Sequence, residues 1–122
     1  MIGTSRTAGV WAYPAPVDLR RGFDGLEALV TTGLRRSALT GDYYLFTNRT
    51  RRSAKVLVWD GTGLLIYHKR LERGRFACLW KSEGEDAVEL TVNELALFLE
   101  GCRLVGQQSL SPAPVVLTAH AA

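Results

Sequence analysis

Three apolar runs in the middle of the chain predict three consecutive strands. They read YYLFTN (43–48), KVLVWD (55–60) and LLIYHK (64–69), and they are rich in aromatic and β-branched residues. The connections are short, and GTG at 61–63 is a tight-turn signal. Strands joined so closely favour an antiparallel meander. RFACLW (75–80) is a candidate fourth strand.

A helical period occurs in the first third of the chain. The apolar residues that share one helix face are Phe23, Leu26, Leu29, Val30 and Leu34. Asp18 is a candidate N-cap for this helix, and Gly33 marks its end. Before it, VWAYP (10–14) is typical of a short strand that ends at proline.

The stretch TVNELALFLEG (91–101) carries the strongest local signal. Thr91 followed by Glu94 three residues later forms a capping box, and Gly101 is placed to end the helix. The apolar face of this second helix consists of Leu95, Phe98 and Leu99.

These elements predict an α+β fold: a small antiparallel β-meander sheet of about four strands with two helices packed on one face. We expect one domain at 10–104, a flexible N-terminus at 1–9 and a disordered tail at 105–122. The chain has 122 residues, of which 47% are hydrophobic, as expected for one globular domain. No apolar stretch has the length of a membrane span, and the N-terminus has no apolar core of signal-peptide type. We therefore expect a cytoplasmic protein without membrane contact.

Charge is unevenly distributed along the chain. The formal net charge is +3, but residues 40–76 hold eight Lys or Arg against three acids. Residues 77–122 hold two against six. A basic middle of this kind fits a polyanionic partner, although a solvated surface accounts for it as well.

The meander topology predicts where these cations meet. The connection at 49–54 and the stretch after 69 should lie at the same end of the sheet, while Asp42 and Asp60 should lie at the opposite end. The candidate nucleic-acid-binding residues are therefore Arg49, Arg51, Arg52, Lys55, Lys69, Arg70, Arg73 and Arg75. Contacts from such a patch to phosphates would position the protein without reading base sequence.

Signals for catalysis are weak. The two Cys and two His lack zinc-site spacing, and GTGLL lacks the end of a P-loop. The carboxylates that could bind a catalytic metal are Asp18, Asp24, Asp42, Asp60, Glu72 and Glu100. Asp42 and Asp60 have no evident third partner, and Asp60 in WDGTG is better explained as a turn residue. The sequence thus predicts no catalytic residue, no metal and no cofactor.

Three motifs in a fixed order carry a family resemblance: DLRRGFDGLEALV (18–30), YLFTNRTRRSAKVLVWDGTGL (44–64) and YHKRLERGRF (67–76). Over roughly residues 10–101 the chain resembles the accessory protein, called TnpB, that the second open reading frame of bacterial insertion sequences of the sixty-six type encodes. In such elements a separate, larger transposase carries the acidic triad. The resemblance implies a non-catalytic role in transposition, with DNA and that transposase as partners.

The resemblance also transfers a set of motif residues without catalytic roles. Besides Lys55, Lys69, Arg70, Leu71 and Arg75 they are Arg20, Arg21, Gly22, Phe23, Gly25, Leu26, Trp59, Asp60, Gly61, Glu72, Gly74 and Phe76. The chain departs from the family pattern in two places. Its basic loop RTRRSA has no acid, and ACLWKS follows GRF where the family has a Trp-Pro-like pair.

Three functional hypotheses follow. The first is a DNA-binding accessory protein for transposition that uses the basic end of the sheet. The second is an interaction module that docks on the transposase through the helix at 91–100 or the acidic C-terminal third. The third is a metal-dependent nuclease, whose activity would be lost on Asp60→Asn.

Overall fold

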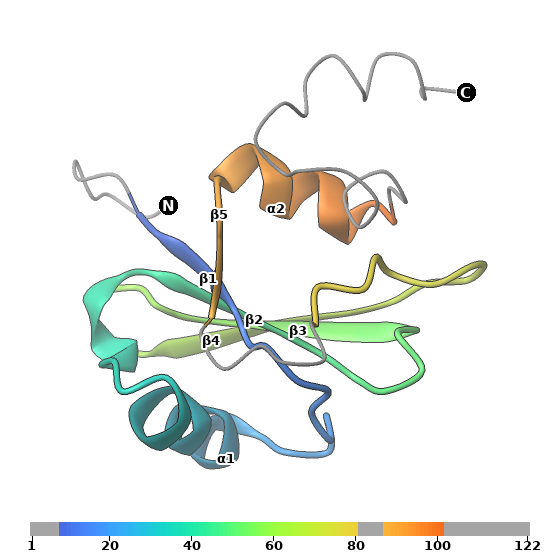
Figure 1. Ribbon diagram of the computed structural model, residues 1–122. Coiled ribbons are helices and arrows are strands. Elements are labelled where there is room, and N and C mark those ends of the chain that lie inside the picture. The colour runs from blue at the N-terminus through green and yellow to red at the C-terminus, as the bar shows by residue number, and fades with distance from the viewer. Residues whose placement is uncertain (1–7, 81–86, 102–122) are drawn as a thin grey trace.

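The computed structural model describes residues 8–80 and 87–101 (Figure 1). Its strands are β1 (Val10–Ala12), β2 (Tyr43–Thr47), β3 (Ser53–Trp59), β4 (Leu64–Arg70) and β5 (Val88–Leu90). Its helical elements are α1 (Phe23–Ala28), the π-helical turn η1 (Leu29–Gly33), the 3-10 turn η2 (Ala38–Thr40) and α2 (Val92–Leu99). The α+β class predicted from the sequence is confirmed.

Over the described residues the sheet has five strands in the order β4-β3-β2-β1-β5 and is mixed. Strands β2, β3 and β4 form the predicted antiparallel meander. However, β1 pairs with β2 in parallel, with Val10 opposite Tyr43, and β5 pairs with β1 antiparallel. The prediction of a purely antiparallel sheet of about four strands was wrong, because the segment between β1 and β2 crosses over the sheet and returns the chain in the same direction.

The two helices lie on opposite faces of the sheet, not on one face as predicted. Figure 1 shows α1 on one side of the sheet and α2 on the other. Leu26 of α1 packs with Tyr44 and Phe46 of β2, whereas Leu95 of α2 packs with Leu45 between them. Successive residues of a strand point to opposite faces. Strand β2 is therefore buried on both sides, which explains its continuous apolar sequence.

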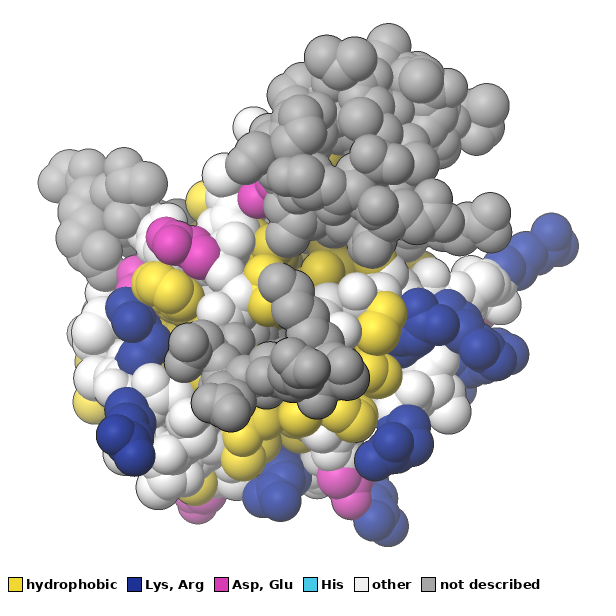
Figure 2. All heavy atoms as spheres, in the orientation of Figure 1, with side chains coloured by type: hydrophobic (Ala, Val, Ile, Leu, Met, Phe, Trp, Pro, Cys, Tyr) yellow, Lys and Arg dark blue, Asp and Glu magenta, His cyan; other side chains and the backbone are white. Residues whose placement is uncertain are grey.

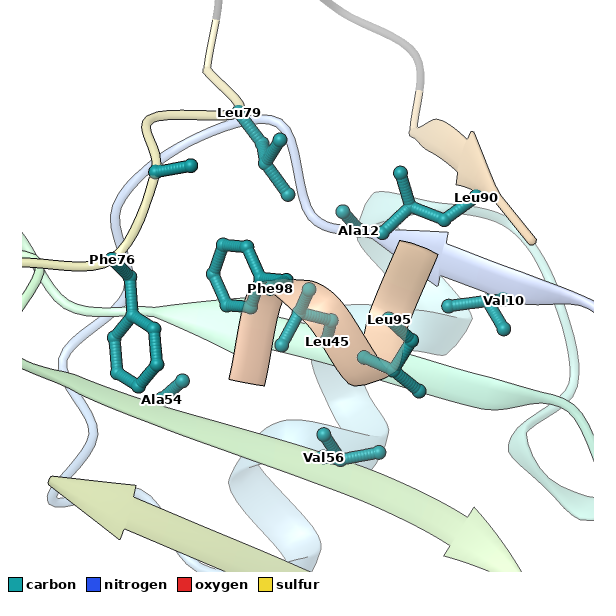
Figure 3. Packing of buried hydrophobic residues seen from close by; sticks show 11 residues of the cluster. Val10, Ala12, Leu45, Ala54, Val56, Phe76, Leu79, Leu90, Leu95 and Phe98 are labelled. Carbon is teal, nitrogen blue, oxygen red and sulfur yellow. The ribbon is translucent and has the colours of Figure 1, made fainter. Parts of the chain in front are cut away.

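Residues 75–80 are not the predicted fourth strand. They run irregularly across the α2 face, where Phe76, Ala77 and Leu79 enter the core. The ring of Phe76 stacks on Phe98 of α2, with ring centroids 4.9 Å apart (Figure 3). This anchor takes the chain out of the plane of the sheet, and among the described residues no strand pairs with this segment.

The start of the first helix also differs from the prediction. Gly22 is the N-cap of α1 and supplies no side-chain cap, while Asp18 bonds to Arg20 instead. Leu26 and Val30 are fully buried as the helical period predicts, but Phe23 is 49% exposed.

The second helix matches its sequence signal. Glu94 N–H donates to Thr91 Oγ1 at 3.0 Å, and Thr91 N–H donates to Glu94 Oε1 at 2.7 Å. Gly101 follows the helix with a φ of 83°, the left-handed conformation that favours glycine at this position. The predicted capping box and helix end are therefore confirmed.

Two of the domain predictions fall outside the described structure. The expected tail at 105–122 lies entirely beyond it, as do residues 1–7 of the expected N-terminus. Within residues 8–80 and 87–101, no helix is long and apolar enough to cross a membrane.

Two phenylalanines of the family motifs should differ sharply in their effect on stability. Phe76 is fully buried against Phe98, so Phe76→Ala should lower the free energy of unfolding by about 3–5 kcal/mol. Phe23→Ala removes the same atoms from an exposed site and should change it by less than about 0.5 kcal/mol. Urea unfolding followed by circular dichroism measures both. Equal losses would show that the two rings are equally buried in solution.

Candidate nucleic-acid interface

The two basic segments lie at the same end of the sheet. Register in the β3–β4 hairpin places Ser53 opposite Arg70 and Ala54 opposite Lys69. Beyond the strands, Leu71 N–H donates to Arg52 C=O at 2.9 Å, which continues the pairing into the loops. In Figure 2, a band of Lys and Arg side chains follows the side of the molecule on which Figure 1 places these loops. The end of the sheet that contains 49–55 and 69–75 is called the basic end below.

A side-chain cap shapes the turn between β2 and β3. The Oδ1 atom of Asn48 accepts from the backbone N–H of Arg52 at 3.1 Å and of Ser53 at 3.2 Å. Arg51 N–H donates to Asn48 C=O at 2.9 Å, and Arg51 itself has a φ of 60°. A non-glycine residue rarely adopts this left-handed conformation, and here the surrounding hydrogen bonds hold it.

Arg51 joins the two basic loops to each other. Its C=O accepts the backbone N–H of Phe76 at 2.7 Å, and its guanidinium donates to Phe76 C=O at 3.0 Å. Both bonds end on the residue whose ring is stacked in the core. Arg51 thus acts as a structural clamp between the two loops, and its guanidinium already donates one hydrogen bond to a carbonyl.

Lys55 attaches a third segment to the basic end. Its Nζ donates to the backbone C=O of Arg21 at 2.9 Å, on the α1 face of the sheet. The exposed Arg21 therefore lies beside the predicted cations, although its distance from them along the chain does not predict this proximity. A bond between residues 34 positions apart leaves no local signal, so only the motif resemblance had selected Arg21.

The neighbouring Arg20 is engaged with an acid. Its guanidinium pairs with the Asp18 carboxylate at 2.7 Å, and hydrogen bonds from the Arg20 side chain and backbone hold the pKa of Asp18 well below its usual range. Arg20 is therefore not counted among the free cations.

The remaining cations of the basic end are free to meet an anion. Within the part of the chain that the structure describes, no carboxylate forms an ion pair with them, and Glu72 in their midst is itself exposed. Lys69 is half-buried, and the other free cations are exposed: Arg49, Arg52, Arg70, Arg73 and Arg75.

His68 titrates in this positive environment. It lies opposite Lys55 in the hairpin, next to Lys69 and close to Arg70. Partial burial lowers the pKa of His68 below its ordinary value of 6.5, and the charges of Lys55 and Arg70 lower it further. The histidine therefore adjoins the basic end as a neutral group at pH 7.

The glycines of the family motifs shape the turns at both ends of β4. Gly61 and Gly74 have φ values of 107° and 73°, which a side chain would strain. In the first turn, Asp60 Oδ1 accepts from the N–H groups of Thr62 and Gly63, each at 2.9 Å, and these bonds lower the pKa of Asp60. Asp60 is thus a turn residue.

The other motif residues differ in how closely they are packed. Gly22 has open space around it, whereas a Cβ at Gly25 would meet the Arg21 side chain at 3.0 Å. Leu26 is fully buried, and Trp59 is half-buried at the end of β3.

The nuclease hypothesis gains no support from the far end of the sheet. Asp42 is largely buried, where its carboxylate accepts from Gly9 N–H and the Trp11 indole and approaches Arg36 at 3.9 Å. Asp60 is occupied by its turn. Among the described residues, no group of three or more His, Cys, Asp or Glu is arranged to hold a metal ion.

The contribution of the Arg51 hydrogen bond to stability can be distinguished from the effect of removing its positive charge. Arg51→Ala loses the charged hydrogen bond to Phe76 C=O and should lower the free energy of unfolding by about 1–2 kcal/mol. Arg49→Ala removes the same charge from an exposed position in the same turn and should change it by less than about 0.5 kcal/mol. Urea unfolding compares the two, and equal effects would contradict the clamp.

His68 should make stability depend on pH. Well above pH 6.5 the histidine is neutral in both the folded and the unfolded chain. As the pH falls below 6.5 the unfolded chain binds the proton first, because the folded pKa is lowered, so stability decreases until that lowered pKa is passed. Thermal unfolding of the wild type and of His68→Gln would be compared between pH 7.5 and about 5. The two melting temperatures should be similar at pH 7.5, and the variant should have the higher melting temperature at about pH 5. A constant difference across this range would contradict the assignment.

Comparison with known proteins agrees with these motifs. The chain matches the family described as IS66 Orf2 like protein over residues 8–109. Two uncharacterized proteins of Sinorhizobium fredii, y4jC and y4hO, are 33% and 32% identical to it over 101 residues. These alignments cover 83% of this chain and 85% and 86% of the two relatives. No solved structure gives a significant match. The chain therefore belongs to the IS66 Orf2-like protein family.

Proposed function

We propose that this protein is a non-catalytic accessory factor for transposition that holds DNA by its phosphates at the basic end of the sheet. Membership in the IS66 Orf2-like family supports the link to an insertion sequence. The transposase of the same element is then the protein that performs the chemistry, and it is a second proposed partner.

The convergence of free cations at one end of a rigid sheet carries the proposal. Arg49 and Arg52 come from the β2–β3 turn, and Arg70, Arg73 and Arg75 come from the end of β4 and the loop that follows it. Backbone pairing of Leu71 with Arg52 and the Arg51 clamp hold these two loops together. The backbone positions from which these exposed side chains extend are thus held relative to each other before any ligand arrives.

Pre-organisation matters because the phosphates of a duplex are fixed as well. Side chains that extend from an ordered backbone leave less conformational entropy to be lost on binding than those of a flexible tail. Each phosphate that they neutralise releases a counterion, so affinity should fall steeply with salt. Arginine suits this task because its planar guanidinium can bind two phosphate oxygens at once.

Charge reversal at one arginine tests the proposal. Binding of labelled duplex DNA would be measured across a salt titration for the wild type, for Arg70→Glu and for Arg35→Glu. Both substitutions change the net charge equally, but Arg35 is an exposed residue that follows η1 in the chain and lies outside the basic end. Arg70→Glu should weaken binding and make the negative slope of log K against log salt less steep by about one. Arg35→Glu should leave that slope unchanged.

Two outcomes separate the alternatives. Equal losses for the two variants would mean that net charge alone attracts the DNA, and the basic end would not be the site. No binding at low salt by the folded wild type would remove the DNA role and leave docking on the transposase. A terminal inverted-repeat duplex and a scrambled duplex, run side by side, show whether sequence is read as well.

A further inference from the structure

The outer edge of the sheet at β4 is long and apolar over its first half. β4 has seven residues, whereas β5 at the opposite edge has three. Natural sheets protect their edges with short strands or charges, because unpaired backbone groups pair readily with another chain. β4 begins with LLIY, in which Leu65 is 44% and Tyr67 is 53% exposed. Its charges occur only at the end that contains Lys69 and Arg70.

The backbone of β4 has a defined set of free groups. On the hairpin side, Asp60 N–H donates to Gly63 C=O, and Leu71 N–H donates to Arg52 C=O. The odd-numbered residues of β4 therefore direct their backbone groups towards β3, since this direction alternates along an antiparallel strand. The even-numbered residues direct theirs outward, and they are Leu64, Ile66, His68 and Arg70. Within the described residues, no strand pairs with this outer side.

A second copy of β4 complements these groups along its full length. If two copies pair antiparallel about Tyr67, Leu64 lies opposite the partner's Arg70 and Ile66 lies opposite the partner's His68. Each such pair joins residues whose backbone groups point outward, as hydrogen bonding requires. A register shifted to either side leaves part of the seven-residue strand without a partner, so only the centred register pairs the whole strand.

Side chains also fit this register. On the α2 face, Tyr67 lies opposite the partner's Tyr67 at a non-hydrogen-bonded position, where side chains approach most closely. Lys69 lies opposite the partner's Leu65, and no cation of β4 faces another cation. Like charges placed opposite each other would destabilise the pair, and the arrangement of β4 avoids them.

An apolar groove runs along the same edge. It has a volume of about 380 Å³ and lies between β4 and α2, with Leu65 and Tyr67 on one side and Leu95 and Leu99 on the other. In the centred register the partner's Tyr67 lies next to Tyr67, which lines this groove. The paired edge would then remove apolar surface from water as well as satisfy backbone groups.

From this edge we infer that the protein forms a two-fold symmetric dimer through antiparallel pairing of β4 with the β4 of a second copy, centred on Tyr67. The surface is self-complementary, as a two-fold interface requires. The two sheets would join into one continuous sheet, with the basic ends of the two copies pointing in opposite directions along it. This inference does not rest on DNA binding and is tested without DNA.

Tyr67→Lys tests the centre of the interface. It places two cations opposite each other on the two-fold axis, while the half-exposed position should tolerate lysine in a single copy. Sedimentation velocity of the full chain over a concentration series should show a two-chain species whose dissociation constant rises at least about tenfold in the variant. Leu39→Lys, at a 47% exposed leucine outside the sheet, is the matched control and should leave the dimer unchanged.

Disulfide formation between introduced cysteines tests the register of the β4–β4 pairing. It does not require a variant that destabilises the dimer. In a background with Cys78→Ser and Cys102→Ser, Tyr67→Cys should form a disulfide between two copies under mild oxidation. Leu65→Cys should not, because Leu65 faces Lys69 of the partner subunit. Non-reducing gel electrophoresis reads out both variants.

Three results would overturn the inference. A monomer at every concentration would do so, leaving the chain's own residues 102–122 or another protein as the cover of this edge. A dimer that Tyr67→Lys does not weaken would place the interface elsewhere. Cross-linking of Leu65→Cys as efficient as that of Tyr67→Cys would exclude the centred register.

Discussion

The pairing of Arg51 with Phe76 is the constraint on which the arrangement of the candidate site depends. Two hydrogen bonds join these residues, and the Phe76 ring lies in the core against Phe98. The surface loops that carry the free cations are thereby tied to the packing between the sheet and α2. Loss of that packing would release the loop after β4 and separate its arginines from those of the β2–β3 turn. The electrostatic surface is thus a consequence of a buried aromatic contact.

Local signals predicted the parts of the fold that local interactions determine. The hairpin of β3 and β4 follows from apolar runs separated by a glycine turn, and the capping box at Thr91 and Glu94 acts within one helical turn. The failures concern long-range pairing. The insertion of β1 beside β2 and the choice of face for each helix depend on contacts between distant segments, which leave no periodic signal. RFACLW has the composition of a strand, but tertiary packing of Phe76 overrides that propensity.

In the candidate site, too, the sequence predicts what depends on local connectivity and misses what depends on long-range contacts. Hairpin connectivity alone places residues 49–55 and 69–75 at one end, so the grouping of the eight cations follows from the sequence. Their separate roles do not. Lys55 donates to the carbonyl of Arg21 and Arg51 to that of Phe76, and these partners lie 34 and 25 positions away. A count of charges treats these two residues like Arg49 or Arg73, although their side chains stabilise the fold.

Strand β4 links the two surfaces that we assign to this protein. An edge strand that spread lysines along its length would resist pairing but would carry positive charge away from the basic end. Here the charges are gathered at one end of β4, where they add to the basic end, and the other end is left apolar. That asymmetry is unfavourable for parallel pairing, which would align cation with cation. It is favourable for antiparallel pairing, which sets each cation against an apolar residue. A single distribution of residues along one strand therefore adds charge to the proposed phosphate-binding surface and favours one direction for the proposed pairing with a second copy.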